Sequence, residues 1–182
     1  MEVVDLRYPI GPEATGTPLA DAIRDLEESP ALLRQAVRGL DDAQLDTAYR
    51  PDGWALRQVV NHLASSHAHA YTRCHFALVE DTPEVRGYRQ ELTDAAALPL
   101  EIPLDLFDAL DRRLVALFRT LTPGQLGRTF HHSQRGPMTV QQLAVFLAWH
   151  ARHHTAHITS LRERMGWMQA PDKRRRAPIR KR

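Results

Sequence analysis

Cysteine is nearly absent from this chain of 182 residues, in which Cys74 stands alone. A single cysteine excludes an intrachain disulfide framework and fits a reducing compartment, so we expect Cys74 to pack in the core. Long apolar runs are missing as well, and we expect neither a membrane-spanning segment nor a cleaved signal peptide. Together these absences predict a cytoplasmic protein without a membrane partner.

Most of the chain carries no large excess of positive or negative charge. The formal net charge is +2, but residues 171–182 carry seven Lys or Arg and one Asp, so the other 170 residues sum to −4. A mildly acidic body does not continue the basic surface of the tail, which makes a nucleic-acid-binding module a remote alternative. We expect residues 1–170 to form one domain and residues 171–182 to form a disordered extension.

The chain does contain apolar residues at the spacing typical of helices. Apolar residues recur at intervals of three and four, and Ser, Thr or Pro capping signals precede several of the runs. This pattern predicts helices over residues 17–39, 55–80, 104–121 and 139–166, with Thr17 and Thr139 as N-caps. Pro30 predicts a kink or a short break near Ser29. The buried face of the third helix is expected to hold Leu106, Leu110, Leu114, Leu117 and Phe118. A long connection with a short helix near 89–97 should join the second and third helices.

Histidine is unusually frequent, and two segments hold most of it. In the second helix a core-facing stripe runs from Leu56 to Leu78 with His67 at its centre. A lone histidine on an apolar face is usually a satisfied core residue, but a second histidine-rich segment weakens that interpretation here. The remaining histidines outside the fourth helix are expected on the surface: His62, His69, His75, His131 and His132.

The fourth helix has four histidines between positions 150 and 157. Residues four apart on a helix lie on one face, so His150 with His154 and His153 with His157 each form a pair that can bind one ion. Spacing alone leaves the two pairs equal. No His-Glu-x-x-His motif is present, so the chain lacks the carboxylate base of that class of metalloenzyme.

The segment from Gly53 to His67, followed by Tyr71 and Arg73 and then by Trp149 to Ile158, resembles the DinB/YfiT-like superfamily and its branch of metal-dependent hydrolases. The resemblance implies an all-α four-helix bundle, usually a homodimer, with one divalent ion per subunit, Zn²⁺ first and Ni²⁺ second. It implies His67, His153 and His157 as ligands, and His150, His154, Trp149, Tyr71 and Arg73 as residues around them. Ala55 replaces the family's usual Ser or Thr cap, which leaves Asp52 as a substitute.

Three imidazoles leave coordination positions open, as in catalytic sites. Related families are thiol S-transferases, and the missing carboxylate favours that route, so we expect an enzyme that activates a low-molecular-weight thiol for transfer to an electrophilic small molecule. The alternatives are a hydrolase that uses water and a metal-binding module without catalysis. The residues themselves identify neither the substrate nor the metal, and sedimentation equilibrium would test the homodimer.

Overall fold

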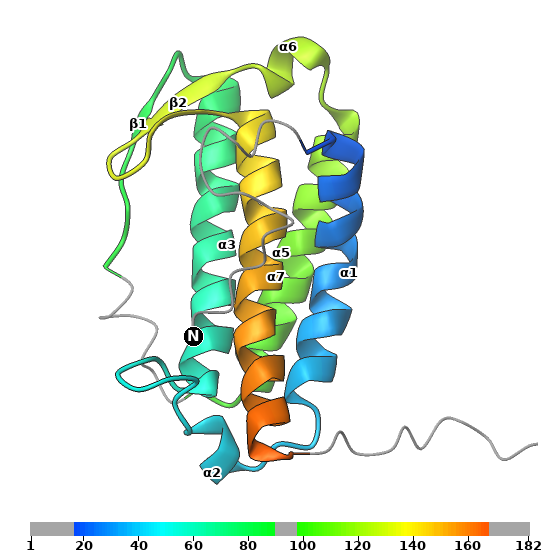
Figure 1. The fold of residues 1–182 in the computed structure, drawn as a ribbon. Helices are drawn as coiled ribbons and strands as arrows, with labels where there is room; N and C mark the ends of the chain where they lie inside the picture. The colour runs from blue at the N-terminus through cyan, green and yellow to red at the C-terminus, as the bar shows by residue number, and fades with distance from the viewer. Residues whose placement is uncertain (1–16, 90–97, 168–182) are drawn as a thin grey trace, which may run out of the picture.

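Four long helices make up most of the molecule (Figure 1), for which a computed structural model describes residues 17–89 and 98–167. The all-α four-helix bundle expected from the sequence is confirmed. The long helices are α1 (Leu19–Val37), α3 (Leu56–Val79), α5 (Glu101–Thr120) and α7 (Val140–Met165). Two single turns, α2 (Asp42–Leu45) and α6 (Pro123–Leu126), lie in the connections.

The order of the helices around the bundle differs from the order along the chain. α1 packs against α5 and α7, and α3 packs against the same two helices, so α1 and α3 lie on a diagonal. α3 and α5 run in the same direction (Figure 1). The chain must therefore return along the whole bundle between them, about 36 Å for a helix of 24 residues. This geometry is why the connection after α3 is long.

A small sheet lies over the end of the bundle where α7 begins. Its strands are β1 (Glu84–Val85), β2 (Thr129–His132) and β3 (Gly136–Thr139), in the order β1-β2-β3. β1 pairs with β2 in parallel, and β2 pairs with β3 as an antiparallel hairpin. The sheet therefore ties the connection after α3 to the segment that leads into α7.

Local signals explain where the helices begin. Thr139 caps α7, because its hydroxyl accepts from Gln142 N at 3.0 Å while the Gln142 side chain accepts from Thr139 N at 2.8 Å. This is the predicted capping box. At α3 the expectation for Asp52 is wrong: Ala55 is the N-cap residue, and its N–H donates to the Gln58 side chain at 2.9 Å.

Expectations for the other two long helices need correction. The N-cap of α1 is Pro18 rather than Thr17, and α1 continues through Pro30, so the break expected near Ser29 is wrong. Packing of Leu26, Pro30 and Leu33 against the bundle outweighs the lost hydrogen bond. In α5 the predicted buried face is confirmed at Leu114 and Phe118 and wrong at Leu106, which is exposed. The interior also includes Phe107, Asp111 and Val115, so the buried face is rotated from the predicted one.

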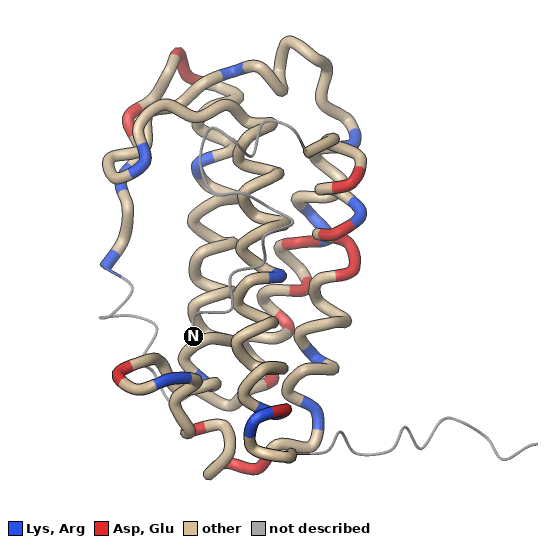
Figure 2. The backbone as a smooth tube through the Cα atoms, viewed as in Figure 1, with Lys and Arg blue, Asp and Glu red and all other residues tan. Residues whose placement is uncertain are grey.

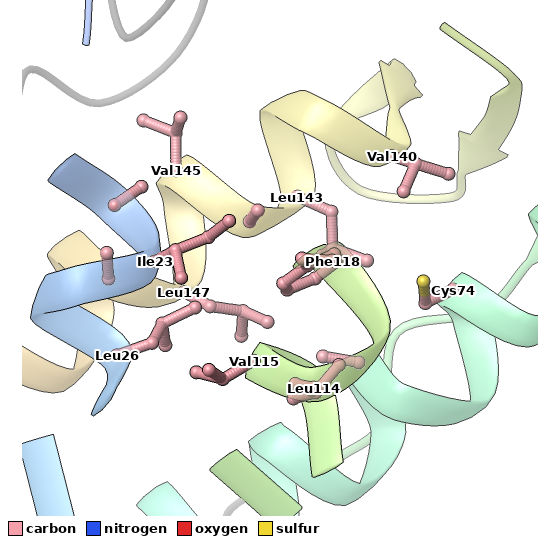
Figure 3. Close-up of a cluster of buried hydrophobic side chains, with 14 of the residues drawn as sticks. Ile23, Leu26, Cys74, Leu114, Val115, Phe118, Val140, Leu143, Val145 and Leu147 are labelled. Carbon is pink, nitrogen blue, oxygen red and sulfur yellow. The ribbon is translucent and has the colours of Figure 1, made fainter. Parts of the chain in front are cut away.

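The apolar core consists of two clusters. One packs α1, α5 and the first half of α7 around the end that carries the sheet (Figure 3), and it includes Cys74. Burial raises the pKa of the Cys74 thiol to about 11, which keeps it protonated, as expected of a packing residue. The second cluster lies at the opposite end, around Leu33, Leu56, Phe107 and Leu161.

Charged residues are distributed unevenly over the helices (Figure 2). α1 and α5 carry acids and bases along their lengths, whereas α3 has only Arg57 and Arg73 and no acid. Within the described residues no helix combines the length and hydropathy that a bilayer-spanning segment needs. The predicted helix near 89–97 and the predicted tail fall almost entirely outside the described residues.

Candidate metal centre

Three histidines from α3 and α7 meet beside a cavity in the bundle. His62 lies in the second turn of α3, and His150 and His154 lie one turn apart in the middle of α7. One ligating nitrogen of each lies within 4.8 Å of those of the other two, and the two Nε2 atoms of His62 and His150 are 3.0 Å apart. We refer to these residues as the histidine triad. In the part of the chain described, it is the one group of this kind.

The two α7 members of the triad provide neutral imidazoles. His62 and His150 are buried and His154 is half-buried. Burial, and after it the neighbouring imidazoles, lowers the pKa of His150 and of His154 well below 6.5. Because a neutral ring keeps the lone pair that a metal ion needs, both side chains are ready to act as ligands near neutral pH.

The donor set fits a divalent cation. The Nδ1 atoms of His150 and His154 are buried and have no hydrogen-bond partner among the described residues. A buried polar atom left in this state costs about 1–3 kcal/mol, so such atoms in a cluster indicate a site for a ligand. Imidazole nitrogens suit Zn²⁺ and Ni²⁺ alike, and three of them leave a coordination position for a further group.

Aromatic side chains orient His62. The Tyr88 Oη atom lies 3.1 Å from His62 Nδ1, and the Trp54 ring lies 4.7 Å from the His62 ring and 6.1 Å from the His154 ring. A partner on the second nitrogen selects the tautomer of a ligating histidine. With an ion on Nε2, His62 Nδ1 would carry the proton and would donate to Tyr88.

The cavity beside the triad has a volume of about 400 Å³, enough for a small molecule. Its walls come from α3, α7, the β2–β3 hairpin and the connection after α3. Phe146, Leu147 and Trp149 form an apolar wall, whereas Arg73 and Arg135 give another part of the wall a positive charge. Two of the predicted neighbours, Trp149 and Arg73, therefore line the cavity. Tyr71 does not, and its hydroxyl accepts a hydrogen bond from Arg113.

His67 lies in a different environment from the triad. It is fully buried, and its Nδ1 atom is 2.5 Å from Oδ1 of Asp111, which is also fully buried. Burial raises the pKa of Asp111, and the adjacent His67 opposes that effect. The His67 ring lies 4.7 Å from the Phe107 ring and 5.8 Å from the His150 ring. His67 is thus beside the triad, with one nitrogen already engaged by a carboxylate.

His153 and His157, the other two predicted ligands, lie next to each other, with ring centroids 4.4 Å apart. His153 stacks on Trp149 at 4.7 Å, and His157 stacks on Tyr49 at 4.2 Å. The ligand atoms of His67, His153 and His157 do not form a group comparable with the triad. As a ligand set these three residues stay a prediction. Sequence spacing favoured neither of the two histidine pairs of α7, and the fold brings one of them, His150 with His154, together with His62.

Two expected surface histidines are buried. His62 is only 4% exposed and His132 only 6%, so the surface prediction is wrong for both, whereas His69, His75 and His131 are not buried. His62 was missed because the first half of α3 is buried around most of its circumference rather than on one stripe. The uncharged stretch between Arg57 and Arg73 was the signal that could have revealed this.

Known proteins resemble this chain over most of its described length. A family model described as the DinB superfamily matches residues 25–158. A Bacillus mycoides (strain KBAB4) protein named "Putative metal-dependent hydrolase" is 42% identical over 172 residues, which cover 90% of this chain and 99% of that protein. An Oceanobacillus iheyensis protein of the same description is 41% identical over 170 residues, covering 88% and 98%.

A solved structure is similar over the same region. It is described as "YfiT from Bacillus subtilis is a probable metal-dependent hydrolase with an unusual four-helix bundle topology". The two chains are 40% identical with a TM-score of 0.80, and the match covers 88% of this chain and 92% of the other. At this identity the resemblance extends beyond the fold to the sequence that builds the bundle.

Proposed function

This chain belongs to the DinB superfamily, and from that premise we propose that it is a metal-dependent enzyme whose divalent ion is bound by His62, His150 and His154. The observation that carries the proposal is the meeting of three imidazoles beside a cavity that admits a small molecule. The relatives are named as metal-dependent hydrolases, and this supports metal dependence. We expect Zn²⁺ first and Ni²⁺ second, with one ion per chain.

Such an ion supplies Lewis-acid chemistry, because it lowers the pKa of a thiol or a water in its open coordination position. The residues of the cavity favour the thiol. No Asp or Glu is among the described residues that line it, so no carboxylate stands ready to take a proton from water. A thiol needs less assistance, since its unperturbed pKa of about 8.5 lies far below that of water.

The proposed reaction is S-transfer from a low-molecular-weight thiol to an electrophilic small molecule. The sulfur forms a bond to the electrophilic carbon, the leaving group departs with the bonding electron pair, and the thiol proton passes to solvent. Within the chain, Tyr88 holds His62 in one tautomer, while Phe146 and Trp149 exclude water from one side of the cavity. A dry wall strengthens the electrostatic interactions on which such a reaction depends.

Hydrolysis is the second candidate, and two observations favour it. The relatives carry hydrolase names, and His153 lines the cavity, where its imidazole can serve as a base for water. In that reaction the triad keeps its place and only the nucleophile changes. The two candidates therefore share a metal centre and differ in what enters the cavity.

The test compares both reactions on the full-length, zinc-loaded protein. One arm measures conjugates of several thiols with an alkyl halide by mass spectrometry, and the other measures hydrolysis of an ester and amide panel. Both arms use a chelator and His62→Ala, with His75→Ala as the matched control on the exposed side of α3. We expect conjugation that is lost with the chelator and with His62→Ala. Conjugation indifferent to both contradicts S-transfer, and ester hydrolysis dependent on both replaces it.

A third outcome is informative as well. If the protein binds its ion but supports neither reaction with any tested substrate, the remaining interpretation is a metal-binding module without catalysis. Retention of metal by the wild type and its loss from His62→Ala would then still support the triad as the binding site.

A further inference from the structure

Three arginines line the same cavity as the triad. Arg73 comes from the C-terminal half of α3, Arg89 comes from the connection after α3, and Arg135 comes from the turn between β2 and β3. Arg73 is half-buried and donates from Nη2 to the carbonyl oxygen of Arg86 at 2.7 Å. Arg135 is exposed on its outer side, and its guanidinium lies 4.3 Å from the centre of the Phe146 ring. The cavity thus has a cationic part beside its metal-binding part.

Neither Arg73 nor Arg135 is neutralised by a carboxylate within the described residues. Other arginines of this protein are neutralised by carboxylates. Arg34 pairs with Glu101 and Asp105, and Arg119 pairs with Glu27. Burial lowers the pKa of Arg73 and of Arg135, and the proximity of Arg135 adds to the effect on Arg73. Because a guanidinium keeps its charge in a protein, two uncompensated charges at one cavity indicate a ligand of opposite sign.

We propose that Arg73 and Arg135 form a subsite for an anionic group, so that the cavity takes a small molecule bearing a carboxylate or a phosphate next to its reacting atom. The planar guanidinium matches both groups, since it can donate two parallel hydrogen bonds to them. Phe146 and Trp149 provide the apolar surface for the carbon skeleton between the two ends. The subsite deepens the proposed function by naming the class of its substrate, but it applies equally to S-transfer and to hydrolysis.

The competing explanation is structural. Arg73 can serve only to hold the connection after α3 through its bond to the Arg86 carbonyl, and Arg135 can serve only to cover Phe146. Both roles predict that substitution lowers the stability of the protein but does not change its preference for an anionic over a neutral ligand. The discriminating measurement is therefore the difference in affinity between an anionic molecule and a neutral molecule of the same shape.

The experiment titrates succinate and its neutral diamide into the full-length protein, loaded with zinc and again after chelation. The readout is the fluorescence of Trp54 and Trp149, which line the cavity. We expect succinate to bind at least tenfold more tightly than the diamide, and we expect Arg73→Gln and Arg135→Gln each to reduce this preference about tenfold. The preference should persist without zinc, because the subsite does not depend on the ion. Inorganic phosphate should compete with succinate.

Arg112→Gln is the matched control, since it removes the same charge from the exposed face of α5. Equal affinity for succinate and the diamide, or the same loss in Arg112→Gln as in Arg135→Gln, overturns the proposal. A preference that disappears on chelation also overturns it, because the carboxylate would then bind the ion. Arg135→Gln keeps the test valid if Arg73→Gln fails to fold. Since neither probe is a thiol or an ester, these outcomes are independent of which reaction the enzyme performs.

Discussion

The interior of the bundle contains two histidine centres that differ in their partners. The triad of His62, His150 and His154 faces a cavity whose described lining has arginines and no acid. His67, only five residues beyond His62 on α3, is fully buried against Asp111 and Phe107. Both centres are histidines inside an apolar bundle. Only the triad offers several imidazoles to one point beside open space.

The difference shows how the partner decides the role of a buried histidine. A carboxylate at 2.5 Å engages His67 through Nδ1 and makes the pair part of the packing between α3 and α5, while His67 Nε2 and Asp111 Oδ2 are buried without a partner among the described residues. His150 and His154 have no such carboxylate, and their Nδ1 atoms lack protein partners in the described part of the chain. A centre that is incomplete without a ligand is the better candidate for binding one.

The largest expected effect distinguishes the two centres by their metal content. We expect His62→Ala, His150→Ala and His154→Ala each to weaken zinc binding by more than roughly 100-fold, because each removes a ligand rather than a supporting contact. His153→Gln and His157→Gln should keep about one ion per chain. Plasma mass spectrometry of dialysed protein provides the measurement. Loss of the ion from His67→Gln, His153→Gln and His157→Gln, with retention in the other three, would establish the set implied by resemblance.

The free energy of unfolding should depend more on the His67–Asp111 pair than on the triad, whereas metal content should depend more on the triad. Asp111→Ala leaves His67 buried without its carboxylate, and breaking a buried pair of this kind costs about 3–5 kcal/mol in the free energy of unfolding. The double variant His67→Leu with Asp111→Leu should lose less, since it leaves no polar group unpaired. Urea denaturation of chelated protein is the appropriate measurement. His62→Ala should change this value far less, and equal losses in both variants would remove the distinction between the centres.

The helices could be predicted because their signals are local. The boundaries of α3 and α7 follow from apolar spacing and, for α7, from Thr139 and Gln142, which lie within four residues of each other. The choice of histidine pair could not be predicted in this way. His150 and His153 differ by three residues, or about 300° around the helix, and only the neighbouring elements decide which side meets the cavity.

Asp111 illustrates the same limit on α5. Its position, four residues after Phe107 and three before Leu114, is the spacing of a core face, but an acidic residue there is ordinarily interpreted as surface. The buried partner that makes this position favourable is His67 on another helix. Because long-range pairs of this type leave no mark in the local sequence, the face of α5 was predicted with the wrong rotation.

The smallest expected effect concerns His132, a buried histidine that, like His150 and His154, has no carboxylate partner among the described residues. Burial, followed by the charges of Arg73 and Arg135, lowers its pKa to about 4, and the backbone N–H of Gln134 donates to its Nδ1 at 3.2 Å. Protonation requires loss of that hydrogen bond. Between about pH 6.5 and pH 4 the unfolded chain therefore binds a proton at this position that the folded chain does not, so acid favours unfolding.

We expect the stability of the chelated protein to fall as the pH decreases from 6.5 to 4, and we expect His132→Gln to make that decline shallower. Glutamine cannot titrate, so this variant removes the linkage while keeping a polar side chain of similar size. His131→Gln is the control, because it changes the neighbouring, less buried imidazole, which bonds to Glu84 at the sheet edge. Urea midpoints at several pH values give the slopes. If His132→Gln has the slope of the wild type, or if His131→Gln flattens it equally, then His132 is not held neutral by its surroundings, and buried histidines without a carboxylate are not all alike.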